Sequence, residues 1–359
     1  MNKKSYFLGG ITAKGFVYFY DNLVKNMDAV LYLDGGMTTI NETIFSHIIE
    51  KFKDKYALEL VHNHLEPELL EAIVIKDINL AIIDRTKMGR DSHLIFPRLR
   101  EDLFYIGEGY DIKLLKKEQS ELFALREKII QLYENAGEHF KRALDIHHKV
   151  EQTYFKYMNI EKANHETKKL IDGFFHNSYL NKPSHTWHRY LGGATSKGAI
   201  DFILDLTDDV DRRIFIKGRS GTGKSTMLKK IVNEAEKRGF DLEIYHCGFD
   251  PDSLDMVILR ELGIAIFDAT DPHSHNPIKT SDEIFDSFEL FVEGDPDQEQ
   301  EKISILEKNY KGEMKGATQV LAQVRDLQRE FESIYKHALN ESFLDVAKNY
   351  VDNWIRRFE

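Results

Sequence analysis

Residues 218–225 read Gly218-Arg219-Ser220-Gly221-Thr222-Gly223-Lys224-Ser225, a complete match to the Walker A pattern G-x-x-x-x-G-K-[ST]. The glycines of this pattern let the backbone turn so that its N–H groups point at phosphate oxygens. The lysine reaches the β- and γ-phosphates, and the serine hydroxyl is a ligand for Mg²⁺. We therefore expect ATP to contact Gly218, Arg219, Ser220, Gly221, Thr222, Gly223, Lys224, Ser225 and Thr226, with Lys224 acting in catalysis.

The residues on either side of this stretch support the interpretation. Residues 213–217 read Arg-Ile-Phe-Ile-Lys, which predicts a short buried strand leading into the loop. Residues 224–238 predict a helix leaving the loop, and Gly239 ends it. A bound phosphate would then lie at a helix N-terminus, where free N–H groups and the helix dipole favour an anion.

The chain contains this unit twice. Residues 7–28 align without a gap onto residues 190–211, and the register continues through both loops. In the first copy, however, four residues of the motif differ: Thr38, Ile40, Asn41 and Glu42 stand in place of Gly221, Gly223, Lys224 and Ser225.

These replacements indicate that the first copy has lost its nucleotide. Ile40 places a β-branched side chain where the backbone must approach phosphate closely. Asn41 lacks the charge of the lysine, and Glu42 would bring a carboxylate beside the phosphates. We therefore expect the N-terminal half to have a structural or regulatory role.

Strand and helix patterns alternate in both copies, which predicts an α/β protein with parallel sheets. Strands are expected at 29–34, 57–62 and 79–84, with equivalents at 213–217, 241–247 and 264–268. The predicted organisation is two repeated P-loop NTPase-like units, each followed by an antiparallel α-helical hairpin. The expected boundaries are 1–117 for the degenerate unit, 118–182 for its hairpin, 183–300 for the intact unit and 301–359 for the second hairpin.

The helical segments carry a heptad seam. Apolar or bulky residues recur from Ile129 to Tyr157 at steps of four and three, and the pattern returns from Val320 to Ala338. Asn340 is the expected cap of a last helix. The seams indicate either ordinary bundle packing or an arm that binds a protein partner. His147 lies in the first seam and is interpreted as a packed histidine.

Asp268 ends the apolar run Ile264-Ala265-Ile266-Phe267, which is the Walker B form. Its carboxylate is expected to act in catalysis and, with Ser225, to hold Mg²⁺. Asp84 is the equivalent residue of the first copy. Many ATPases have a glutamate after this aspartate that orients the attacking water, but this chain has Ala269.

Two acidic residues of the 246–255 segment are candidates for the missing carboxylate. Asp250 or Asp255 would orient water or accept a proton from a substrate hydroxyl. Alternatively, Asp252 and Asp255 cap a short helix.

The Walker A loop, the 246–255 segment and the 268–273 loop together resemble a little-characterised family of bacterial tandem P-loop ATPases. The resemblance covers both halves and implies ATP binding in an α/β P-loop fold, without a known substrate. Family members are expected to have a functional loop in the N-terminal half as well, and Ile40 and Asn41 depart from that pattern.

Composition narrows the function classes. The chain has 359 residues, a net charge of -11 and one cysteine, Cys247. The negative charge argues against broad nucleic-acid binding, and no apolar run has the length of a membrane span. A cytoplasmic location is expected. Guanine is disfavoured because the chain lacks the Asn-Lys-x-Asp tetrapeptide that guanine-specific GTPases normally carry.

Three functions fit these observations. The first is a slow Mg-dependent ATPase with one active site in the C-terminal half. The second is a P-loop kinase for a small molecule, with Asp250 or Asp255 as base. The third is a nucleotide-gated binding protein without turnover.

The duplication also suggests a role for arginines of the first copy. Two copies of one fold often pack as a pseudo-dimer, and P-loop enzymes commonly complete a site with an arginine from a neighbouring domain. Arg85, Arg90, Arg98 and Arg100 follow the Asp84 strand, and Arg90 is the first choice for such a residue.

Overall fold

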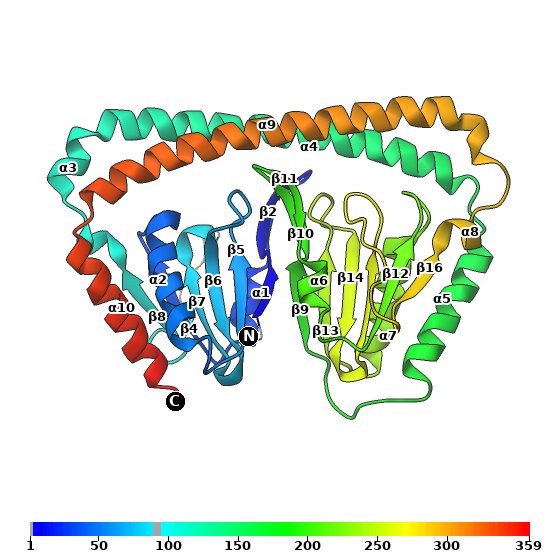
Figure 1. Ribbon diagram of the computed structural model, residues 1–359, viewed down its shortest axis with the longest axis horizontal. Helices are drawn as coiled ribbons and strands as arrows, with labels where there is room; N and C mark the ends of the chain where they lie inside the picture. The colour runs from blue at the N-terminus through cyan, green and yellow to red at the C-terminus, as the bar shows by residue number, and fades with distance from the viewer. Residues whose placement is uncertain (1–2, 89–94) are drawn as a thin grey trace.

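The computed structural model describes residues 3–88 and 95–359, which form two sheet units of the same topology (Figure 1). The N-terminal unit has a six-stranded sheet of order β1-β5-β6-β7-β4-β8, and the C-terminal unit has a six-stranded sheet of order β9-β13-β14-β15-β12-β16. The strands correspond one to one. The duplication in the sequence is therefore also a duplication of the fold, as expected for an α/β protein of two repeated units.

The strands of the N-terminal unit are β1 (Lys3–Tyr6), β2 (Gly9–Thr12), β3 (Gly15–Tyr18), β4 (Ala29–Asp34), β5 (Leu58–His62), β6 (Leu70–Ile75), β7 (Leu80–Asp84) and β8 (Glu101–Tyr105). Those of the C-terminal unit are β9 (Thr186–Tyr190), β10 (Gly192–Thr195), β11 (Gly198–Asp201), β12 (Arg212–Lys217), β13 (Leu242–His246), β14 (Leu254–Leu259), β15 (Ile264–Asp268) and β16 (Glu283–Asp286). The strands predicted after each loop are found within one residue of the expected ends.

The prediction of parallel sheets is wrong for one strand in each unit. β6 is antiparallel to β5 and β7, and β14 is antiparallel to β13 and β15. The connection 247–253 explains the difference, because a parallel strand needs a crossover of roughly a dozen residues or more. Since this connection is too short, the chain turns back at once and β14 enters the sheet antiparallel.

Each unit has an apolar core of its own, and the two units also share a further apolar cluster between their sheets. The short helices α1 (Tyr20–Asn26) and α6 (Ile203–Leu206) lie between the sheets and join a buried cluster that contains residues of both units. Phe7 and Tyr190 exchange backbone hydrogen bonds of 3.0 and 2.9 Å. The two halves therefore pack as one body, in a pseudo-symmetric arrangement.

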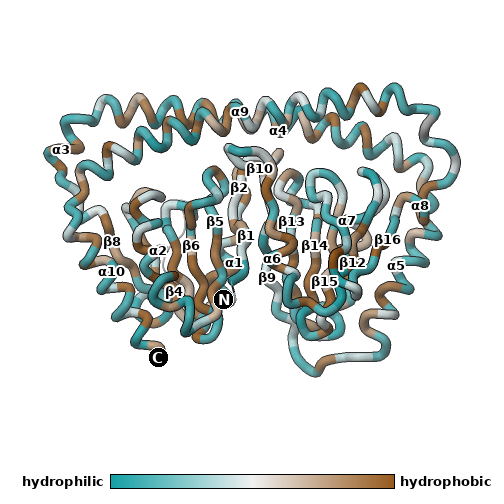
Figure 2. Tube along the Cα trace, viewed as in Figure 1, coloured by the Kyte–Doolittle hydropathy of each residue, from teal (hydrophilic) through white to brown (hydrophobic). Residues whose placement is uncertain are grey.

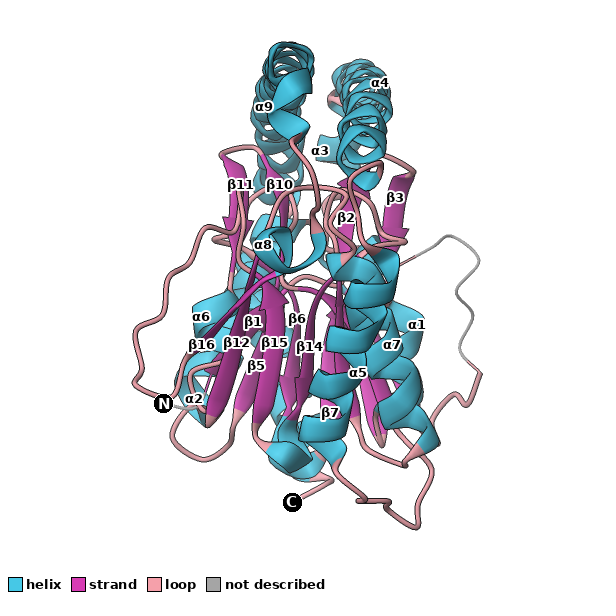
Figure 3. Ribbon diagram, turned by 90° about the vertical axis from the view of Figure 1, so that its right-hand side faces the viewer, coloured by secondary structure: helices cyan, strands magenta, loops and turns pink. Residues whose placement is uncertain are grey.

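Two long helices lie side by side across both sheets, α4 (Gln119–Phe155) and α9 (Gln300–Ala338), and they run antiparallel (Figures 1 and 3). Figure 2 shows hydrophobic strands below them and mixed hydropathy along the helices themselves. Their buried seam contains Ile129, Ala136 and Phe140 of α4 together with Leu321 and Val324 of α9. The heptad pattern thus marks the contact between α4 and α9.

The prediction of a helical hairpin within each half is wrong. The partner of α4 is α9, and α5 (Ile160–Phe175) packs instead on α7 (Lys224–Lys237) of the C-terminal unit. In the same way α10 (Glu341–Arg356) packs on α2 (Thr38–Phe52) of the N-terminal unit. Length explains the choice, because α4 and α9 have 37 and 39 residues whereas α5 and α10 have 16 each. A short helix cannot cover so long a seam at about 1.5 Å per residue.

The remaining helices are short. They are α3 (Ile112–Lys117), α8 (Ser287–Phe291) and the 3₁₀ turns η1 (Lys76–Ile78), η2 (Arg85–Lys87), η3 (Ile106–Gly109), η4 (Arg260–Leu262) and η5 (Pro296–Glu299). In the described part of the chain, we find no helix with both the length and the apolar character needed to cross a membrane.

Candidate functional site

The 218–225 loop joins β12 to α7 at the end of the central strands. Gly218, Gly221 and Gly223 have φ values of 147°, 80° and 77°, and Gly223 is the N-cap of α7. A side chain is strained at such positive φ values, so these positions require glycine. The backbone of this loop is thus tightly curved.

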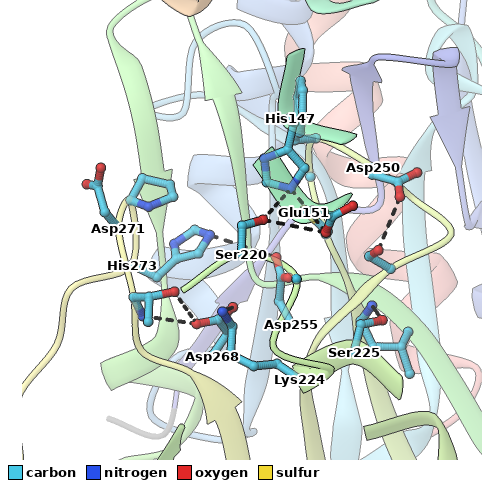
Figure 4. A pocket seen from close by; sticks show the side chains of 18 of the residues that line it. His147, Glu151, Ser220, Lys224, Ser225, Asp250, Asp255, Asp268, Asp271 and His273 are labelled. Atoms are coloured by element: carbon cyan, nitrogen blue, oxygen red, sulfur yellow. Dashed lines mark hydrogen bonds and ion pairs between the residues drawn. The ribbon is translucent and has the colours of Figure 1, made fainter. Parts of the chain in front are cut away.

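A cavity of about 580 Å³ opens over this loop (Figure 4). Its walls come from the loop, from the ends of β13 and β15, from the β10–β11 hairpin and from the helices α4 and α9. The sequence-predicted residues that line it are Ser220, Gly221, Thr222, Gly223, Lys224, Ser225, Thr226, Asp250, Asp255 and Asp268. The fold therefore brings together all four residues predicted to act in catalysis.

Two loop residues of the predicted binding set do not line the cavity. Of the described residues that line the cavity, none is Gly218 or Arg219. Arg219 donates a hydrogen bond to Tyr154 Oη of α4, and its guanidinium lies 5.3 Å from the centre of the Phe288 ring. Its side chain therefore fastens the loop to the surrounding helices.

Lys224 and Asp268 meet at the centre of the site. Lys224 Nζ donates to the carbonyl oxygens of Gly218 (3.1 Å) and Arg219 (3.0 Å) and lies 3.4 Å from Asp268 Oδ2. The other Asp268 oxygen, Oδ1, accepts from the backbone N and the hydroxyl of Thr270. The carboxylate is thus held at the strand end with one oxygen turned toward the lysine.

Ser225 and Asp250 have partners inside the protein. Ser225 Oγ accepts a hydrogen bond of 3.0 Å from the backbone N of Leu254, which leaves its second lone pair available. Asp250 accepts from Ser253 Oγ at 3.1 Å, and its Oδ1 lies 3.1 Å from Lys14 Nζ of the N-terminal unit. Asp250 therefore stabilises a turn and the contact between the units.

Asp255 lies on β14, so the alternative in which it caps a short helix is wrong. It is buried, and Oδ2 has no hydrogen-bond partner among the described residues. Burial raises the pKa of Asp255 to about 6; the charge of Asp268 adds to the shift, while His273 opposes it. A buried carboxyl with a free oxygen at a cavity wall is suited to hold a cation or to exchange a proton.

The sequence did not identify the histidine beside Asp255 as a site residue. His273 Nε2 lies 3.8 Å from Asp255 Oδ2, and His273 Nδ1 lies 3.1 Å from Asp201 Oδ2. Although burial opposes the charged ring, the hydrogen bond and charge of Asp201 and the charge of Asp255 raise the pKa of His273. In the aligned first copy, Tyr18 stands where Asp201 stands. A comparison of the two copies could therefore have indicated Asp201.

The helix α4 also contributes to the site. His147 packs against the rings of Phe249 and Tyr310, as the sequence interpretation has it, and it lies at the cavity as well. His147 and Glu151 both line the cavity, and His147 Nε2 lies 3.0 Å from Ser220 Oγ. Tyr310 and Met314 of α9 complete this wall. The spacing of His147 and Glu151, one helical turn apart, is their only signal in the sequence.

The equivalent place in the N-terminal unit is filled by protein side chains. Asn41, which replaces the lysine, is fully buried, and a Cβ atom on Gly36 would lie 2.1 Å from Asn41 Oδ1. Glu332 of α9 accepts a 2.9 Å hydrogen bond from the backbone N of Thr39 at the start of α2. Lys87 Nζ donates to Thr38 Oγ1 at 2.8 Å. A carboxylate and an ammonium group thus occupy this helix N-terminus.

The arginines that were expected to complete the site bind within the N-terminal unit. Arg85 lies 3.1 Å from Asp34, Arg98 lies 3.4 Å from Asp102, and Arg100 donates to the carbonyl oxygen of Met27. Of the described residues that line the cavity, none is an arginine. The hypothesis is therefore wrong for these three residues, and Arg90 lies outside the described residues.

Comparison of the chain with protein-family models, with curated proteins and with solved structures finds no match.

Proposed function

We propose that this chain is a Mg²⁺-dependent ATP-binding NTPase of the P-loop type with one site, in its C-terminal unit. One observation carries the proposal: a Walker A sequence forms a glycine loop at the N-terminus of α7, with Lys224 Nζ 3.4 Å from Asp268 Oδ2 at the wall of a cavity. A lysine and a strand-end aspartate in this relation are the groups that phosphoryl-transfer sites use.

The donor set fits Mg²⁺. The ion prefers oxygen ligands and keeps several waters, so one or two carboxylates and phosphate oxygens suffice. Ser225 Oγ and Asp268 Oδ2 both line the cavity and offer such oxygens. When bound there, the ion would supply positive charge that neutralises the phosphate oxygens.

The side chains have separate tasks in this proposal. The loop N–H groups and the start of α7 would bind the phosphates. Lys224 would move from the carbonyl oxygens of Gly218 and Arg219 to the β- and γ-phosphates, which replace those acceptors. Asp268 would hold the ion, and its bonds to Thr270 keep the carboxylate oriented. Adenine is favoured because the sequence lacks the Asn-Lys-x-Asp tetrapeptide of guanine-specific GTPases.

A second candidate is phosphoryl transfer to a small molecule. Its specific support is the buried Asp255 carboxyl beside His273, which would accept the proton of an acceptor hydroxyl at the cavity wall. A cavity of about 580 Å³ lies within the ordinary range for small-molecule sites. The third candidate, nucleotide-gated binding without turnover, makes no use of this carboxyl.

A turnover assay separates the three candidates. Purified protein is given ATP or GTP, with and without Mg²⁺, and phosphate release is measured without any added acceptor. The proposal expects Mg²⁺-dependent release from ATP that is lost in Lys224→Ala. ATP binding without release would favour the third candidate, and release only with an added hydroxyl compound would favour the second. Absence of ATP binding would contradict the proposal.

A further inference from the structure

The helix α4 is packed directly on the 218–225 loop. A Cβ atom on Gly221 would lie 2.6 Å from the carbonyl oxygen of Glu151, so no larger residue fits between the loop and the helix. On either side of this contact, Ser220 contacts His147 and Arg219 contacts Tyr154. Three consecutive loop residues are thus fixed by one helix face. α4 follows the N-terminal unit in the chain, but it forms part of the C-terminal site.

Glu151 brings a carboxylate to this contact. Its Oε1 lies 3.5 Å from Ser220 Oγ and 3.5 Å from His147 Nε2, and the side chain lines the cavity. In Figure 4, His147 and Glu151 approach Ser220 from the α4 side, while Lys224 and Asp268 lie on the sheet side. Burial alone would raise the pKa of Glu151, but the hydrogen bond and charge of His147 lower it. The carboxylate is therefore ionised at neutral pH.

The pseudo-symmetry identifies the residue of α9 that is equivalent to Glu151 of α4. Asn159 and Asn340 are the N-caps of α5 and α10. Counting back from these caps, Tyr154 corresponds to Tyr335 and Glu151 to Glu332.

The two carboxylates meet their loops differently. Glu332 is buried and accepts from Thr39 N, and Thr39 aligns with Thr222 of the Walker A loop. In the C-terminal unit the backbone N of Thr222 donates to the carbonyl oxygen of Arg219, at 3.4 Å, and Glu151 does not take the place that Glu332 has in the other unit. Glu332 therefore occupies the position of a phosphate, whereas Glu151 leaves that position open and borders it.

We propose that Glu151 is the carboxylate that orients and deprotonates the attacking water during ATP hydrolysis, and that α4 supplies it from outside the sheet unit. The inference rests on the proposed ATPase function. Ala269 follows Asp268, so β15 does not supply a glutamate at its end.

The reaction balances with groups already named. The water oxygen forms a bond to the γ-phosphorus while the bond to the β–γ bridging oxygen breaks, and that electron pair leaves with ADP. The water proton passes to Glu151, which returns it to solvent after phosphate departs. Lys224 stabilises charge on the phosphate oxygens. His147 positions Glu151 through their 3.5 Å contact and does not touch the water in this scheme.

The test compares Glu151→Gln with Glu332→Gln, the same change at the equivalent position of the other long helix. Glutamine keeps the shape but removes the base, so Glu151→Gln should lower kcat by roughly 10²- to 10⁴-fold, the usual contribution of a general base. The Kd for ATP should stay the same or fall, because a negative charge beside the phosphates is removed. Glu332→Gln should retain turnover within about threefold, since its charge lies in the other unit.

The possible outcomes separate the two proposals. ATP binding by Glu151→Gln shows that the variant is folded. Unchanged or faster turnover with tighter ATP binding would overturn the catalytic assignment and indicate that Glu151 only repels the nucleotide. A wild-type protein that binds ATP without hydrolysing it would overturn the proposed ATPase and this assignment with it.

A second measurement distinguishes catalysis from a structural role. Glu151→Asp keeps the carboxylate and should recover part of the lost kcat. His147→Gln removes the group that lowers the pKa of Glu151, so the acidic limb of the kcat profile should move to higher pH. An identical loss in Glu151→Asp and Glu151→Gln, with no movement of the profile in His147→Gln, would contradict the assignment.

Discussion

The two sheet units have the same strand order but differ at the loop that precedes the first long helix of each unit, α2 or α7. In the C-terminal unit a glycine loop, Lys224 and Asp268 surround a cavity. In the N-terminal unit the side chain of Asn41 fills the loop, and Glu332 bonds to the start of α2. The N-terminal unit thus has internal groups at the place where the C-terminal unit has the glycine loop and its lysine.

The serine position shows this replacement in detail. Ser225 Oγ accepts from Leu254 N at 3.0 Å, and Glu42 Oε2 accepts from the equivalent Leu70 N at 2.7 Å. Glu42 therefore bonds to β6, whereas the sequence suggested that it would point at the phosphates. The N-terminal unit keeps the backbone contact while it loses the hydroxyl that would bind Mg²⁺.

Opposite charges face one another in the N-terminal unit at the place of the C-terminal site. Lys87 is half-buried, and although desolvation would lower its pKa, the charges of Asp84, Glu71 and Glu332 raise it. A buried charge costs several kcal/mol unless it is paired, so these groups depend on one another. Among the described residues, buried polar atoms without a hydrogen-bond partner remain in both units, including Asp84 Oδ2 and Asn41 Oδ1 in the first and Asp255 Oδ2 in the second. The units differ instead in the equivalent carboxyls of β6 and β14: the pKa of Glu71 is lowered and that of Asp255 is raised. The comparison predicts different responses of the two units to matched substitutions.

The largest difference is expected for the lysine position. Lys224→Ala removes the point charge on the β- and γ-phosphates and should lower kcat/KM by roughly 10²- to 10³-fold, the effect of losing one main charge-stabilising group. Asn41→Ala, at the aligned position, should leave kcat/KM within about twofold, because the two sites lie in different units. Steady-state kinetics measures both, and a larger loss in Asn41→Ala would contradict the account.

The strand-end aspartates should differ in their response to metal. Asp268→Asn should weaken Mg²⁺-dependent turnover by about 10- to 100-fold, as expected for a lost metal contact. ATP binding without metal should change little, because only the ion contact is removed. Asp84→Asn should not alter either quantity. Equal losses for Asp268→Asn with and without Mg²⁺ would contradict its assignment as a metal ligand.

The pKa values of two equivalent buried carboxyls, Glu71 on β6 and Asp255 on β14, are shifted in opposite directions. The pKa of Asp255 is raised to about 6, so its contribution to stability is present below pH 4 and is lost as pH rises through 6. In metal-free buffer, Asp255→Asn should gain up to about 3 kcal/mol relative to wild type between pH 4 and pH 8.

Glu71 provides the matched control. Burial would raise its pKa, but the hydrogen bond of His64 and the charge of Lys87 lower it below the usual value of 4.5. Its contribution is therefore present above that value and lost as pH falls. Glu71→Gln should destabilise the protein more at pH 8 than at pH 4. Urea unfolding at both pH values gives these free energies, and the same sign for both variants would contradict the comparison.

The smallest effects should be equal in the two halves. Asn159 and Asn340 cap α5 and α10, with side chains that accept from Lys162 N and Ser342 N. Replacing either residue with alanine should cost about 1 kcal/mol, the usual value of an N-cap. Thermal unfolding of the two variants measures the cost. A clearly larger loss for one of them would show that the equivalent helices do not contribute equally.

Most of the sheet could be predicted from the sequence because its signals are local. The 264–268 run of apolar residues predicts β15 with its exact ends, and the run at 29–34 does the same for β4. β14 was missed although its sequence, Leu-Asp-Met-Val-Ile-Leu, is apolar with one acid. The turn-forming residues before it and the acid at its start suggested a helix cap, and strand direction depends on the length of the connection.

The long-range pairing of helices could not be predicted in the same way. A heptad seam shows that a helix packs against another helix, but it does not identify the partner. The apolar seam of α4 is therefore compatible with packing against α5 or against α9, and only α9 is long enough to cover it. For the same reason His147 and Glu151 were not predicted as site residues, because their contact with the 218–225 loop depends on where α4 crosses the C-terminal unit.

The most direct test is calorimetric titration of the full chain with ATP in the presence of Mg²⁺, using wild type, Lys224→Ala and Asn41→Ala. The account predicts one nucleotide per chain in wild type and in Asn41→Ala, and loss of most of the affinity in Lys224→Ala. Two comparable sites per chain, or unchanged binding by Lys224→Ala, would contradict the claim that the C-terminal unit alone holds the nucleotide.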